Sequence, residues 1–76
     1  MKADKIKLVG VVTPYNRYFD LWVKEVGMKM YGDGFKFIRL SKIDDIRGLE
    51  FHTIEKGYRY YEVGEDIYNN AVLRIK

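Results

Sequence analysis

The chain has 76 residues, of which 47% are hydrophobic and 33% are charged, and its formal net charge is +3. This length suits one small domain spanning residues 1–76, and the hydrophobic share excludes the composition of a disordered chain. The sequence contains no cysteine, so neither disulfides nor thiolate metal sites can stabilise the fold.

Charge is distributed unevenly along the chain. Residues 1–42 hold nine Lys or Arg against four acidic residues, a net charge of +5, whereas residues 43–70 have a net charge of −4. A dipolar chain of this kind orients a partner more than it attracts polyanions in general. The longest apolar run, residues 8–12, is too short to cross a bilayer, and the charged start of the chain lacks a signal-peptide pattern. We therefore expect a cytoplasmic protein with no membrane partner.

The first expected element is a strand over residues 5–12, where side chains alternate and then run apolar. The next segment, residues 14–26, fits two structures. As a helix it places its aromatic side chains on one stripe, and as a strand it places Phe19, Leu21 and Val23 on one face. Its aromatic and β-branched residues favour the strand, with a helix as the alternative.

Two glycine-containing turns then predict two β-hairpins. The first turn, Gly32 to Gly34, joins strands over residues 26–31 and 35–40. The second turn, Glu55 to Gly57, joins strands over residues 49–54 and 58–63. Three-residue loops with Gly34 and Gly57 at positive φ sort the apolar and polar side chains best.

This register places Met28, Ile38, Leu49 and Phe51 in the core, and a short strand over residues 71–75 completes the chain. The elements predict a mainly β fold, a small antiparallel sheet or barrel of about five or six short strands built from the two hairpins. The alternative is an α+β fold in which one helix at about residues 14–26 packs on the sheet.

The residues offer little for catalysis. Ser41 and His52 are the single serine and the single histidine, and each fits a structural position, Ser41 in a turn and His52 in a strand. Adjacent acids such as Asp44 and Asp45 point to opposite sides of an extended backbone, which disfavours shared acid–base or metal chemistry. We therefore expect no enzyme activity, no cofactor and no metal site.

Two expected outer faces could bind a macromolecule. The face of the second hairpin combines tyrosines with arginine, a composition that interface cores favour. Its candidate protein-binding residues are Tyr58, Arg59, Tyr60, Tyr61 and His52. The face of the first hairpin interleaves basic and aromatic side chains, as stacking on nucleic-acid bases requires. Its candidate nucleic-acid-binding residues are Lys29, Tyr31, Phe35, Phe37 and Arg39.

The sequence thus indicates a small non-enzymatic binding module that acts through protein–protein contact, as an inhibitor, an adaptor or a self-associating subunit. Its partner is another protein or a copy of itself. The alternative is a nucleic-acid-binding protein that uses the basic and aromatic face, although eleven acidic residues make its basic footprint patchy. A compact chain rich in tyrosine and lysine, without a catalytic set, would also suit a viral accessory protein.

Overall fold

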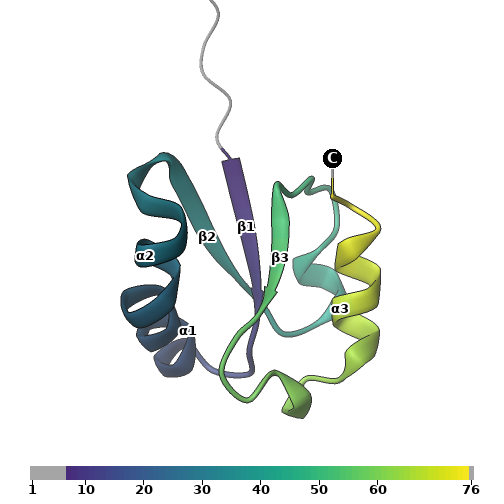
Figure 1. Cartoon of the computed structure of the whole chain (residues 1–76). Helices are drawn as coiled ribbons and strands as arrows, with labels where there is room; N and C mark the ends of the chain where they lie inside the picture. The colour runs from purple at the N-terminus through teal and green to yellow at the C-terminus, as the bar shows by residue number, and fades with distance from the viewer. Residues whose placement is uncertain (1–6, 76) are drawn as a thin grey trace, which may run out of the picture.

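The structure is a computed structural model that describes residues 7–75. Its centre is a sheet of three strands, β1 (Lys7–Val12), β2 (Phe35–Leu40) and β3 (Thr53–Lys56). The spatial order is β2-β1-β3, and both pairs are parallel, so all three strands end at the same edge of the sheet (Figure 1).

The central strand β1 is covered on both faces. Val9, Val11 and Val12 are fully buried, which explains the continuous apolar run in this part of the sequence. Gly10 lies between them, and a Cβ atom there would be 2.7 Å from Leu40 Cδ1 and 2.8 Å from Ile54 Cδ1. Only glycine therefore lets the neighbouring side chains close over the middle of β1.

A helix covers one face of the sheet. It runs without a break through α1 (Asn16–Trp22), a π-helical segment (Val23–Gly27) and α2 (Met28–Tyr31). Its Trp22 is buried against Val9 and Val11. The C-cap residue of the helix is Gly32, which has a φ of 77°. Because this helix connects β1 to β2, it forms the crossover that a parallel strand pair requires.

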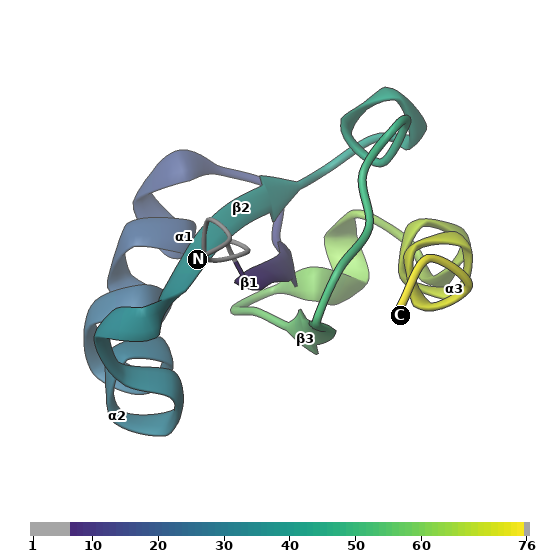
Figure 2. The same cartoon turned by 90° about the horizontal axis from the view of Figure 1, so that it is seen from above.

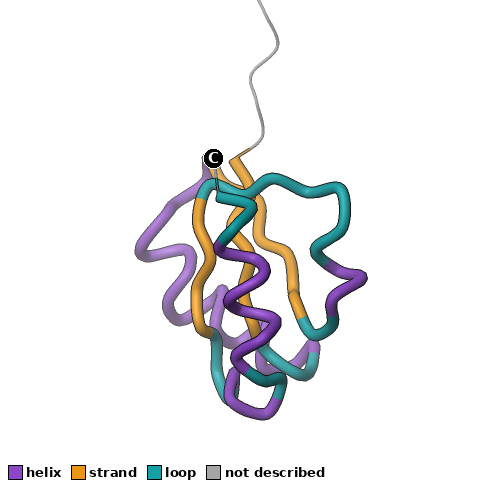
Figure 3. Tube along the Cα trace, turned by 90° about the vertical axis from the view of Figure 1, so that its right-hand side faces the viewer, coloured by secondary structure: helices purple, strands orange, loops and turns teal. Residues whose placement is uncertain are grey.

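The opposite face is covered by α3 (Glu65–Val72) and by the connection between β2 and β3 (Figures 2 and 3). Ile67 and Ala71 of α3 pack with Leu40, Ile54 and Phe51 in the larger apolar cluster. The connection contains a 3₁₀ turn (Ile43–Asp45) and carries the chain to the other side of β1. The molecule therefore has three layers, with the sheet between the two helical layers.

The predicted antiparallel hairpins are wrong. Residues 26–31 belong to the helix, and Gly32–Gly34 forms a 3₁₀ turn between that helix and β2. Of the second hairpin, residues 53–56 form a strand, but Tyr60–Glu62 forms another 3₁₀ turn. The fold is a small α+β domain with an open parallel sheet. The alternative of a helix near residues 14–26 comes closer, although that helix continues to Tyr31.

The glycine prediction fails with the hairpins, whereas the core prediction is confirmed for Phe51 and wrong for Met28. Among the described glycines, positive φ occurs at Gly32, Gly48 and Gly64, and not at Gly34 or Gly57. Of the four predicted core residues, Phe51 is fully buried, Ile38 and Leu49 are half-buried, and Met28 is 43% exposed. Met28 is exposed because it lies on the helix and not on an inward face of a strand.

Candidate functional site

The end of β1 is the point where the chain connections diverge. From β1 the chain turns to the helix on one face, whereas from β3 it turns to α3 on the other face (Figures 1 and 2). In open parallel sheets, ligands and partners bind outside the carboxyl ends of the strands at such a switch point. The residues that follow β1 and β3 at this point are therefore the candidate site.

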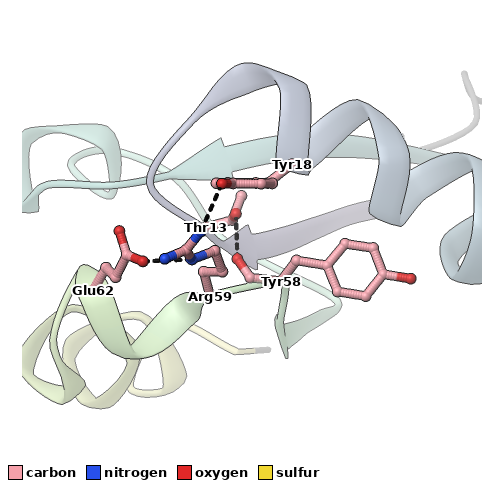
Figure 4. Close-up of polar contacts among 5 residues, drawn as sticks. All are labelled: Thr13, Tyr18, Tyr58, Arg59 and Glu62. Carbon is pink, nitrogen blue, oxygen red and sulfur yellow. Dashed lines mark hydrogen bonds and ion pairs between the residues drawn. The ribbon is translucent and has the colours of Figure 1, made fainter.

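Thr13 joins these two segments. Its side chain is fully buried, and its Oγ1 donates a hydrogen bond of 2.7 Å to the carbonyl oxygen of Tyr58 (Figure 4). One residue earlier, the N–H of Gly57 donates to the carbonyl oxygen of Val12 at 2.9 Å. The segment after β3 is thus fixed against the end of β1 by one side-chain and one backbone hydrogen bond.

Arg59 adopts a conformation that is uncommon for a residue with a side chain. Its φ of 57° and ψ of 30° lie in the left-handed helical region, and it is the non-glycine residue with positive φ among residues 7–75. Its guanidinium donates to the hydroxyl of Tyr18 at 2.9 Å and pairs with the carboxylate of Glu62 at 2.5 Å. These contacts hold the side chain across the switch point (Figure 4).

Two guanidinium groups lie close to the ring of Tyr18. The guanidinium carbon atoms of Arg17 and Arg59 are 5.3 Å and 5.5 Å from the centroid of its ring, within the range of cation–π contact. The hydrogen bond from Arg59 has the largest effect on the Tyr18 phenol and lowers its pKa. Burial acts in the opposite direction, and Arg17 lowers the pKa further. The ring of Tyr15, which is 53% exposed, lies 5.8 Å from that of Tyr18.

Tyr58 extends the same surface along the helix. Its hydroxyl donates to the carboxylate of Glu25 at 2.7 Å, and this hydrogen bond raises the pKa of the phenol. We use the name tyrosine–arginine surface for the group of side chains assembled here from the two segments. Its members are Tyr15, Arg17, Tyr18, Tyr58 and Arg59.

Arg39 has a structural role at the same carboxyl edge of the sheet. Its guanidinium donates to Asn16 Oδ1 at 2.8 Å, to the carbonyl oxygen of Pro14 at 3.1 Å and to Ser41 Oγ at 2.8 Å. The hydroxyl of Ser41 also bonds the carboxylate of Asp45. These contacts tie the end of β2 to the start of α1.

The structure separates the five residues predicted to bind protein. Tyr58 and Arg59 belong to the tyrosine–arginine surface, and Tyr61 is 66% exposed in the adjacent 3₁₀ turn. Tyr60 packs against the larger core, with the Lys56 ammonium 5.1 Å from its ring centroid. His52 lies at the opposite, amino edge of the sheet, where its ring is 5.0 Å from that of Phe35.

The five residues predicted to bind nucleic acid do not form one open face. Lys29 and Tyr31 belong to α2, whereas Phe35, Phe37 and Arg39 belong to β2. The rings of Phe35 and Phe37 are half-buried beneath the helix, where Tyr31 lies 5.0 Å and 6.0 Å from them. The face that was expected to stack bases is largely occupied by the chain itself.

Sequence reasoning missed the part of the surface that follows β1. Tyr15 and Tyr18 were considered only as members of a strand or an amphipathic helix, and Arg17 only as part of the basic half that could help to bind nucleic acid. A usable signal was present, because residues 15–18 and 58–61 both combine tyrosines with an arginine, and each follows a segment ending at the same edge. The parallel topology was needed to show that these two segments meet.

Within residues 7–75 there is no group of three or more His, Cys, Asp or Glu side chains placed to hold a metal ion. The helices of this part of the chain are also too short, or insufficiently apolar, to cross a membrane. Comparisons with protein-family models, with curated proteins and with solved structures found no match to this chain.

Proposed function

We propose that the chain is a small non-enzymatic module that binds another protein through the tyrosine–arginine surface. The observation that carries the proposal is that Arg17 and Arg59 both contact Tyr18 at the switch point of the sheet. Tyrosine and arginine are the residue types that supply most binding energy in protein interfaces. Here they come from two segments that the fold brings together.

The preorganisation of this surface supports the same proposal. Arg59 is held by Tyr18 and Glu62, and Tyr58 is held by Glu25 and by the bond from Thr13 to its carbonyl oxygen. Side chains that are already ordered lose less conformational entropy when a partner binds. The energetic cost of the left-handed Arg59 backbone is offset by these contacts.

The carboxylates in this surface favour a protein over nucleic acid. Glu25 and Glu62 bond Tyr58 and Arg59 directly, so these two members of the surface each have an anionic neighbour. Such pairs oppose a phosphate backbone but fit the mixed charges of a protein surface. We place the interaction in the cytoplasm, because secreted domains of this size usually rely on disulfides and this chain has no cysteine.

The test is an affinity capture from host-cell lysate at low salt, with and without nuclease, using wild-type chain and two double variants. Tyr15→Ser with Arg17→Ser removes exposed members of the surface. Lys29→Ser with Met30→Ser is the matched control, since it removes one cation and one exposed large side chain from the far end of the same helix.

We expect the wild-type chain and the control variant to capture the same protein, with or without nuclease. The Tyr15 and Arg17 variant should capture about tenfold less of it, the effect of truncating one or two interface hot spots. Equal capture by both variants would contradict this surface. Capture that disappears with nuclease would favour nucleic acid as the partner instead.

A further inference from the structure

The outer edge of β2 is open. In the order β2-β1-β3, β2 pairs only with β1, and no strand within residues 7–75 pairs with its other side. The β3 side of the sheet is partly closed. Phe51 forms a parallel bridge with Ile75, and the N–H of Phe51 donates a hydrogen bond to the carbonyl oxygen of Arg74. The six residues of β2 contain no proline and therefore present backbone donors and acceptors that a further strand could use.

A groove runs between this edge and the helix. It has a volume of about 530 Å³, and its apolar lining comes from Phe19, Val23 and Met28 of the helical layer and from Phe35 and Phe37 of β2. Alternate residues of a strand point to the same face. A strand added to the edge of β2 would therefore direct every second side chain into this groove.

The charged side chains at the rim of the groove favour an acidic binding partner. Lys24 and Lys36 border the groove together with a single acid, Asp20. If two copies of the chain paired through β2, the two edges would carry the same excess of positive charge at the groove. Like charges across a strand pair are destabilising, whereas carboxylates opposite these lysines are favourable.

We propose that the β2 edge and this groove bind an extended segment of another protein, in which apolar side chains alternate with acidic ones. The segment would add to the sheet as a fourth strand, with its backbone bonded to β2, its apolar side chains in the groove and its carboxylates near Lys36. Backbone pairing supplies affinity in this mode of binding, and the side-chain positions supply specificity. This site is separate from the tyrosine–arginine surface and does not depend on it.

The test uses a short acetylated peptide of alternating valine and glutamate, with a peptide of alternating valine and lysine as its control. Binding is followed by amide chemical shifts of the isotopically labelled chain. We expect the glutamate peptide to shift the amides of residues 35–40. The lysine peptide should bind at least about threefold more weakly, because it places an ammonium group opposite Lys36 where the glutamate peptide places a carboxylate.

The variant Lys36→Glu tests the charge argument without touching the core, because Lys36 is exposed. It should reduce the preference for the glutamate peptide, and Tyr15→Ser with Arg17→Ser should leave that preference unchanged. N-methylation of alternate peptide nitrogens should abolish binding if the backbone pairs with β2. Shifts confined to other residues, or no shifts with either peptide, would overturn the proposal, as would a dimer of the free chain formed through β2 and detected by light scattering.

Discussion

The buried hydroxyl of Thr13 donates a hydrogen bond of 2.7 Å to the carbonyl oxygen of Tyr58, across 45 residues of sequence. This contact connects the segment after the central strand to the segment after β3. It determines where Tyr58 and Arg59 stand relative to the start of the helix. The geometry of the candidate binding surface and the stability of the domain therefore both depend on this hydrogen bond.

Replacing Thr13 by valine tests this relationship. The two side chains have similar shapes, so the substitution removes the hydrogen bond and leaves a buried carbonyl oxygen without that donor. We expect a loss of about 1–3 kcal/mol in the free energy of unfolding. Urea denaturation followed by tryptophan fluorescence measures it, and an unchanged midpoint would show that the contact does not stabilise the fold.

Replacing Gly57 by alanine should destabilise the domain much more than replacing Gly34 by alanine. A Cβ at Gly57 would lie 2.7 Å from Val11 Cγ1 and 3.1 Å from the carbonyl oxygen of Val12, so Gly57→Ala should cost about 1–3 kcal/mol through overpacking. Nothing lies within 4 Å of a Cβ at Gly34. Gly34→Ala should therefore change stability by less than about 1 kcal/mol. Equal thermal denaturation midpoints for the two variants would contradict this packing.

Leu40 and Leu73 form a second matched pair. Leu40 is fully buried at the end of β2, whereas Leu73 is 81% exposed after α3. Leu40→Ala should reduce the free energy of unfolding by about 2–5 kcal/mol, because it removes buried methyl groups and leaves a cavity. Leu73→Ala should change it by about 0.5 kcal/mol or less. A similar loss for both variants in denaturant titrations would be inconsistent with the parallel register of β2.

Tyr31 should make stability depend on alkaline pH. Burial raises its pKa to about 12, and the hydrogen bond that its hydroxyl donates to the Glu55 carboxylate acts in the same direction. An unfolded tyrosine ionises near pH 10, so the contribution of Tyr31 is fully present below about pH 10 and is lost as the pH rises to about 12.

Denaturant titrations between pH 9 and pH 12 measure this effect, with the pH range taken from these two pKa values. Tyr31→Phe should flatten the decline in stability over this range. Tyr61→Phe is the control, because Tyr61 is 66% exposed and its ring packs on that of Tyr60. If Tyr31→Phe kept the wild-type pH dependence, Tyr31 would not be the group responsible.

Part of this architecture follows from the sequence by itself. The pattern over residues 5–12 predicted a strand, and the structure has β1 at Lys7–Val12, while residues 5 and 6 lie outside the described residues. The apolar residues of 35–40 likewise determined a strand, and Phe51 was correctly expected in the core. These features depend on neighbours in the chain, and local pattern is sufficient to predict them.

The helix and the direction of the strands depended on tertiary structure. Aromatic and β-branched residues in 14–26 have a preference for strands, but packing of Trp22 against Val9 and Val11 stabilises the helix. Residues 16–31 form the crossover helix that a parallel pairing of β1 and β2 requires. The glycines near residues 32 and 57 then no longer serve as hairpin turns.

The candidate surface shows the same limit. Residues 58 and 59 could be selected from composition, but Tyr18 and Arg59 are 41 positions apart and meet only because β1 and β3 are parallel neighbours. Gly57, read in the sequence as a turn residue, is required because its backbone passes against Val11 and Val12. Contacts between distant segments depend on the topology of the sheet, and periodicity along one chain carries no information about that topology.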